Sequence, residues 1–144
     1  MESLARAFAR SVPERPADQG LFGPRSIVWR VHRDRSFPLA GIRSLIVQAL
    51  HPLAMAGVAQ HSTWQQDPFG RMAATSGYIL TVTYGDTGAA HRAGSFVRGV
   101  HGHVNGTDPA TGLAYRASDP NLLLWIHAAL VDSIVHVVQR YGRG

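Results

Sequence analysis

The sequence contains no cysteine and no lysine in its 144 residues. Without cysteine, the chain forms no disulfide, holds no metal through thiolates and has no cysteine nucleophile. This suits a reducing cytoplasm, where we expect the protein to be located. The 14 basic residues are therefore all arginines, and with nine acidic residues they give a formal net charge of +5. This charge is compatible with nucleic acid, an anionic membrane or an acidic substrate, and it selects none of them.

Motifs that mark several large enzyme classes are also absent. The chain has no glycine-rich phosphate loop, no G-x-G-x-x-G and no H-E-x-x-H. Its nine acidic residues are scattered singly, so no carboxylate pair indicates acid–base hydrolysis. No zinc-finger spacing or aromatic-plus-basic sheet motif is present, so we expect no nucleic-acid partner.

No apolar run has the uninterrupted length of a membrane span, which requires about 20 predominantly apolar residues. The N-terminal residues 1–12 also lack the apolar core and cleavage site of a signal peptide. We therefore expect no transmembrane segment, and peripheral membrane contact stays open. The two most apolar runs, 44–59 and 122–138, are predicted to be buried helices of a soluble protein. Their interruptions are Gln48, His51 and Pro52 in the first run, and His127, Asp132 and His136 in the second.

Helical periodicity extends along most of the chain. A chain of this length fits one domain with a sizeable core. We predict an all-α, single-domain bundle of about six helices. Residues 1–23 would form an N-terminal helix and linker, and residues 24–144 the helical domain. The expected helices are 1–12, 25–33 with Ile27, Val28 and Val31 facing inward, 39–50, 53–60, 68–84, a helix that starts after Asp86, and 120–141 with His127 on its apolar face.

Helix boundaries have local signals. Asp67-Pro68 and Asp119-Pro120 each combine an N-cap residue with a proline at the first helical position, where its missing N–H costs nothing. Gly85-Asp86-Thr87 is predicted to end one helix and cap the next. Residues 79–84 (ILTVTY) have strand-like β-branched density, but their neighbours have a helical period, so we predict a helix there. Residues 105–119 are predicted to form an ordered loop with a short hairpin.

Residues 67–106 carry the side chains that could form a site. Arg71 and Thr75 lie on one face of the predicted helix, because positions four apart are neighbours. His101 and His103 lie on opposite borders of the next helix's apolar stripe, since residues two apart diverge by about 200°. On a strand both imidazoles would share one side, as in a metal-binding barrel, but the helical period argues against this. The apolar stripe consists of Ala90, Ala93, Val97, Val100 and Val104.

Two interpretations of these residues remain open. A guanidinium, a hydroxyl and an imidazole on two packed helices could hold a cofactor or a substrate oxygen. Alternatively, Arg71 and Thr75 could form an ordinary solvated face. A single helical histidine could equally be a hydrogen-bonded core or rim residue.

Several stretches of the chain resemble one protein family. They run in order from about residue 20 to residue 142. The stretches are QALHPLAMAGVAQHS, DPFGRMAATSGYILTVTYGD, VRGVHGHVNGTDPATGLAYRASDPNLLLWIHAALVDS and the closing YG. The family that they resemble groups the latex-clearing rubber oxygenases with the fungal mycophenolate-pathway oxygenase. The resemblance implies an all-α oxygenase that cleaves carbon–carbon double bonds of isoprenoid chains with dioxygen, on a b-type haem in the rubber oxygenases.

The resemblance also implies functional residues. His101 matches the histidine that ligates haem iron from the proximal side. Arg71 and Thr75 match the arginine and threonine that line the haem pocket in R-x-x-x-T spacing, as catalytic and cofactor-binding residues. This chemistry is reasonable, because a neutral imidazole binds iron and an arginine pairs with a haem propionate. Family histidines without an assigned role are matched by His51, His61 and His127.

The sequence departs from the rubber oxygenases at two points. Ala74 stands where they carry a lysine that can occupy the distal side of the iron. Residues 53–62 contain no counterpart of their acidic residue upstream of the arginine. The fungal subgroup is therefore the better match. Domains of this family usually continue with further helices, so we expect a short member or a fragment that lacks C-terminal helices.

Two functions follow as expectations. The first is a haem b-dependent oxygenase whose partners are dioxygen and an apolar, isoprenoid-like small molecule. The second is a non-catalytic helical module that binds an apolar ligand or a partner chain, including a second copy of itself. A nucleic-acid binder would rest on the net charge alone.

Overall fold

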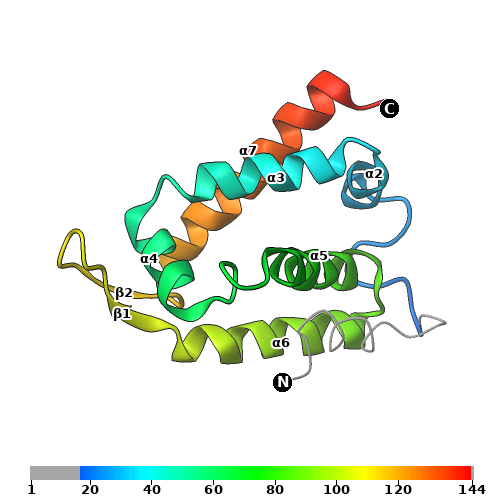
Figure 1. Cartoon of the computed structure of the whole chain (residues 1–144). Coiled ribbons are helices and arrows are strands. Elements are labelled where there is room, and N and C mark those ends of the chain that lie inside the picture. Colours follow the sequence, from blue (N-terminus) through cyan, green and yellow to red (C-terminus); the bar gives the residue numbers. More distant parts are fainter. Residues whose placement is uncertain (1–16, 144) are drawn as a thin grey trace. The chain divides into compact units, whose positions relative to one another are not determined.

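The computed structural model describes residues 17–143, which contain six helices and one short two-stranded sheet (Figure 1). The predicted all-α class with about six helices is confirmed. The helix predicted at residues 1–12 lies outside the described residues. The elements are α2 (Ile27–Arg33), α3 (Phe37–Gln48), α4 (Pro52–His61), α5 (Pro68–Tyr84), α6 (Thr87–His103), β1 (Asn105–Thr107), β2 (Ala114–Arg116) and α7 (Pro120–Tyr141).

The described chain divides into two compact units. The first unit contains residues 17–30 and Ser62–Val100, which include α5 and most of α6. The second contains Val31–His61 and residues 101–143, which include α3, α4, the hairpin and α7. The domain boundary expected after residue 23 stays a prediction.

The predicted helix starts are confirmed by capping hydrogen bonds. Asp67 Oδ1 accepts from the N–H of Gly70 at 2.8 Å at the start of α5. Asp119 Oδ1 accepts from the N–H of Asn121 at 2.8 Å at the start of α7. Asp86 makes the corresponding bond to the N–H of Ala89 before α6. Helix α5 continues to Tyr84, so the helical prediction for ILTVTY is also confirmed.

Three of the predicted helices, α2, α3 and α4, begin at other residues than predicted. Helix α2 begins at Ile27 rather than at residue 25, and Ile27 is 72% exposed, so its predicted inward orientation is wrong. Helix α3 begins and ends two residues earlier than predicted. Pro38, in the first turn of α3, favours the early start, because its fixed φ suits that position. Pro52 begins α4, which is bent by 105° from α3.

Helices α3 and α7 run antiparallel in the second unit (Figure 1). Arg43 Nη1 forms an ion pair with Asp132 Oδ2 at 2.7 Å. Trp125 Nε1 donates to the Gln48 carbonyl at 3.4 Å, which links the end of α3 to the start of α7. The side chains buried along these two helices are small or medium-sized: Ala40, Ser44, Ala129, Ser133 and Val137.

The prediction that the apolar runs form buried helices is wrong for most of their large side chains. The largest fully buried side chains among residues 17–143 are Thr81, Ser44 and Ser133. Small residues are buried because they let helix backbones approach closely, whereas leucine or isoleucine at the same contacts would hold the helices apart. Large aliphatic side chains of α3 and α7 therefore lie outside these contacts. His127 is exposed with them and does not lie on the packed face.

By its length and composition alone, helix α7 could cross a membrane. Core helices of soluble proteins also meet this criterion. The bent pair of α3 and α4 also meets the test if it is counted as one span. The expected absence of a transmembrane segment stays a prediction.

The predicted hairpin is confirmed between α6 and α7. Strands β1 and β2 pair antiparallel, with Gly106 opposite Tyr115. Tyr115 is buried, and its hydroxyl donates to Gln60 Oε1 at 2.8 Å. Gln60 Nε2 in turn donates to the Thr107 carbonyl at 3.0 Å. These bonds hold the hairpin against the end of α4.

Candidate functional site

Arg71 lies in the first turn of α5 and is held by two side chains of the first unit. Its Nε donates to Ser62 Oγ at 3.1 Å, and its Nη1 donates to Thr75 Oγ1 at 2.7 Å. The Thr75 hydroxyl donates in turn to the Arg71 carbonyl at 3.1 Å. The Thr75 hydroxyl therefore accepts one hydrogen bond from Arg71 and donates another to it. These two bonds fix the direction of the guanidinium.

The Arg71 guanidinium keeps one unused edge. Its Nη2 makes no hydrogen bond within residues 17–143. Partial burial lowers the pKa of Arg71 from its ordinary value, but arginine stays cationic at neutral pH. An oriented cation with free N–H groups can bind a carboxylate or phosphate through charge-assisted hydrogen bonds.

Ala74 precedes Thr75 on α5 and is almost completely buried. Its methyl group cannot ligate a metal. The resemblance matches this position to the distal lysine of the rubber oxygenases, and the buried Ala74 side chain contributes only packing.

His101 and His103 both lie in the last turn of α6, so the strand interpretation of H-x-H does not hold. His101 is half-buried and His103 is exposed, as expected from their divergent directions. His101 belongs to the second unit, while Arg71 and Thr75 belong to the first. The assembly of the three residues into one site stays a prediction.

The metal-ligating and cationic side chains of the described residues can be compared with what the haem implied by the resemblance would require. Within residues 17–143, no group of three or more histidines or acidic residues could hold a metal ion. A haem would need less from the protein, because one imidazole could bind its iron and one cation could pair with a propionate. The imidazole of His101 and the free guanidinium edge of Arg71 have the chemistry to meet these needs.

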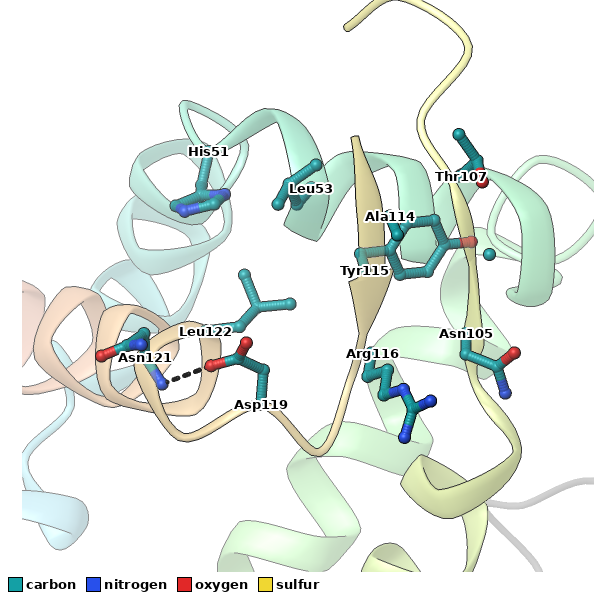
Figure 2. A pocket seen from close by; sticks show the side chains of 11 residues that line it. His51, Leu53, Asn105, Thr107, Ala114, Tyr115, Arg116, Asp119, Asn121 and Leu122 are labelled. Carbon is teal, nitrogen blue, oxygen red and sulfur yellow. Dashed lines mark hydrogen bonds between the residues drawn. The ribbon is translucent and has the colours of Figure 1, made fainter. Parts of the chain in front are cut away.

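A cleft of about 550 Å³ opens in the second unit between the start of α4, the hairpin and the start of α7 (Figure 2). His51 lies at one end, and Asn105 and Arg116 lie at the other. His51 stacks at a tilt on Trp125, with ring centroids 5.7 Å apart. His51 Nδ1 is buried without a hydrogen-bond partner among the described residues. The other lining residues are Leu53, Gly106, Thr107, Ala114, Tyr115, Asp119, Asn121 and Leu122.

The sequence did not predict this cleft, because its lining comes from three separated segments. Of the lining residues, the family resemblance singled out only His51. His61 is also matched to a family histidine by the resemblance, and its side chain contacts the hairpin. Its Nε2 lies 3.1 Å from the Asn105 carbonyl, and its ring packs edge-on against Tyr115.

Comparison with known families identifies the chain's relatives. The family model described as "ER-bound oxygenase mpaB/B'/Rubber oxygenase, catalytic domain" matches residues 29–144. No curated protein and no solved structure matches the chain. The matched region covers most of the chain and includes Arg71, Thr75 and His101. The protein therefore belongs to the family of mpaB and rubber oxygenase catalytic domains.

Proposed function

We propose that the protein is a haem-dependent oxygenase that acts on an apolar, unsaturated, isoprenoid-like substrate. Membership of an oxygenase family supports the reaction class. The observation that carries the proposal is the fixed Arg71 guanidinium, which Ser62 and Thr75 hold with one edge free. A reducing cytoplasm is the location that we propose, since the chain has no cysteine.

Each of the three residues has a separate part in this proposal. Arg71 would bind a propionate of the haem through its free N–H groups. Thr75 would keep the guanidinium in place, since both of its hydrogen bonds go to Arg71. His101 would bind the iron through a neutral imidazole. A bound haem would supply the activation of dioxygen.

The absorption spectrum tests the proposal most directly. We expect purified protein supplied with hemin to show a Soret band that His101→Ala abolishes. His103→Ala is the matched control, because it removes the same ring two residues away on the exposed side of α6. Arg71→Ala should weaken hemin binding less than His101→Ala does, since one charge-assisted bond contributes roughly 1.5–3 kcal/mol.

Two results would contradict the proposal. One is colourless protein that does not bind added hemin. The other is loss of the Soret band in His103→Ala while His101→Ala keeps it. This result would make His103, and not His101, the iron ligand.

A non-catalytic module that binds an apolar ligand or partner is the second candidate. The large exposed aliphatic side chains and Ala74 in place of a distal lysine favour it. This function predicts a stable oligomer and no oxygen uptake with an unsaturated terpenoid. A monomer that consumes oxygen steadily with such a substrate would rule it out.

A further inference from the structure

His101 lies at a weak end of α6. Gly99 and Gly102 are close to it in the sequence, and glycine weakens a helix relative to alanine. The last carbonyls of a helix also have no partner within the helix, so a last turn opens easily. A side chain that binds a metal, in contrast, must be held within a narrow range of directions. The last turn of α6 therefore needs support from outside the helix.

The residues that follow α6 link His101 to the hairpin. The Val104 N–H donates to the His101 carbonyl at 3.2 Å, and the Val104 carbonyl accepts from the Ala117 N–H at 2.9 Å. Strand β1 begins at the next residue, Asn105. Contacts that hold the hairpin therefore also hold the last turn of α6.

Side chains at the end of α4 bind the backbone of β1. His61 Nε2 lies 3.1 Å from the Asn105 carbonyl, and because a carbonyl only accepts, this nitrogen is the donor. Gln60 Nε2 donates to the Thr107 carbonyl at 3.0 Å. The hydroxyl of the buried Tyr115 donates to Gln60 Oε1 at 2.8 Å, and the Tyr115 ring contacts that of His61. We call Gln60, His61 and Tyr115 the hairpin clamp.

The residue opposite Tyr115 leaves room for the hairpin clamp. Gly106 pairs with Tyr115 across the hairpin, and Figure 2 shows the Tyr115 hydroxyl beside β1. A Cβ at Gly106 would lie 2.8 Å from Tyr115 Oη and 2.9 Å from Gln60 Oε1, so an alanine there would displace the bond between these side chains. The hairpin clamp, β1 and His101 all belong to the second unit.

We propose that the hairpin clamp positions His101. Gln60 and His61 are positioning residues that act through the backbone of β1: they order the last turn of α6 and thereby set the direction of the His101 imidazole. This gives a role to His61, to which the resemblance assigns none. The proposal rests on the proposed function, in which His101 binds the iron. Its tests therefore begin with the haem-free protein, where the order of the last turn is measured separately.

Amide hydrogen exchange measures how often the last turn of α6 opens. Gln60→Leu/His61→Phe removes the three hydrogen bonds of the hairpin clamp and should accelerate exchange of the Val104 N–H about tenfold. Gln139→Leu/His136→Phe is the matched control, since it replaces the same residue types at exposed positions on α7 of the same unit. The control should exchange like the wild type.

Single variants of His61 separate its hydrogen bond from the packing of its ring. His61→Phe keeps an aromatic ring beside Tyr115 but has no N–H to donate, whereas His61→Gln has a side-chain N–H with a similar reach. We expect the NMR signals of the His101 ring to shift and broaden in His61→Phe and to return to their wild-type positions in His61→Gln. A contribution from packing alone would give the reverse.

Hemin titration connects the hairpin clamp with the proposed function. Gln60→Leu/His61→Phe should bind hemin about three- to tenfold more weakly than the wild type, because the apparent affinity falls with the fraction of molecules whose His101 is correctly directed. Gly106→Ala should act in the same direction. Gly41→Ala is its control, because a Cβ at Gly41 meets no atom within 4 Å.

Three results would overturn the proposal. The first is unchanged Val104 exchange and unchanged His101 signals in Gln60→Leu/His61→Phe, even if its Tm falls. The second is unchanged hemin affinity in this variant when the wild type binds hemin. The third is a control pair that behaves like the clamp pair.

Failure of the proposed function gives a different result. The wild type then binds no hemin, and the exchange rates and ring signals of the haem-free protein still decide whether the hairpin clamp orders His101. If circular dichroism shows that Gln60→Leu/His61→Phe does not fold, the single His61 variants decide, because the His61 side chain is exposed.

Discussion

Thr75 is the side chain whose role the structure defines most sharply, because both of its hydrogen bonds go to Arg71. We expect Thr75→Val to weaken hemin binding by about 0.5–1.5 kcal/mol, the usual net contribution of one hydrogen bond. Valine keeps the shape and the branched Cβ of threonine but does not accept from Arg71 Nη1. Thr75→Ser keeps the hydroxyl and should restore most of the affinity in a hemin titration. Equal losses in the two variants would show that Thr75 acts through packing.

Helix starts depend on contacts within a few residues, as α5 illustrates. Asp67 caps its first turn through the N–H of Gly70, and a Cβ on Gly70 would collide with the Asp67 carboxylate. Asp67→Ala should cost about 1 kcal/mol of unfolding free energy. Gly70→Ala should raise the free energy of unfolding of the wild type only slightly, because the new methyl group displaces the Asp67 carboxylate from its capping position.

Once the cap has been removed, the same substitution should behave differently. In the Asp67→Ala background, Gly70→Ala should stabilise by about 0.5–1 kcal/mol, the usual advantage of alanine over glycine in a helix. Urea unfolding of the wild type, both single variants and the double variant measures the coupling. Strictly additive effects would mean that the carboxylate and the methyl group do not compete for the same space.

Stability of the whole molecule should depend on acid pH through carboxylates in both units. Hydrogen bonds lower the pKa values of Asp18, Asp34 and Asp108 below their ordinary values. Their contribution is therefore complete above the unfolded pKa and is lost as the pH falls through the folded values. The main donors are the N–H groups of Thr87 and Gly20 for Asp18, the hydroxyl and N–H of Ser36 for Asp34, and the Thr111 hydroxyl for Asp108.

Thermal unfolding at a series of pH values tests this dependence. We expect these groups to leave the Tm unchanged between about pH 5 and 7 and to lower it below about pH 4. Asp34→Asn should make the acid limb shallower, because one titrating hydrogen-bond acceptor has been removed. An unchanged acid limb in this variant would show that the bonds to Asp34 do not contribute to folding.

Local features of this protein could be predicted from the sequence. The caps at Asp67 and Asp119, the continuation of α5 to Tyr84 and the hairpin before α7 are all confirmed. Each depends on hydrogen bonds or backbone preferences within a few residues, so the short-range pattern contains the necessary information. The family also followed from the sequence, because its motifs occur in order along most of the chain.

Long-range packing, and not the local sequence, decides which side chains are buried and which distant side chains lie together. Ile27 and His127 lie in apolar stretches, yet both are exposed. For His127 the reason is that α7 packs on another face, mainly through small residues. The bond of Arg71 to Ser62 and the cleft beside His51 likewise depend on how the chain folds back on itself. Periodicity identifies a helix's apolar side, but burial requires a neighbour that can approach it. That neighbour is set by the size and shape of residues far away in the sequence.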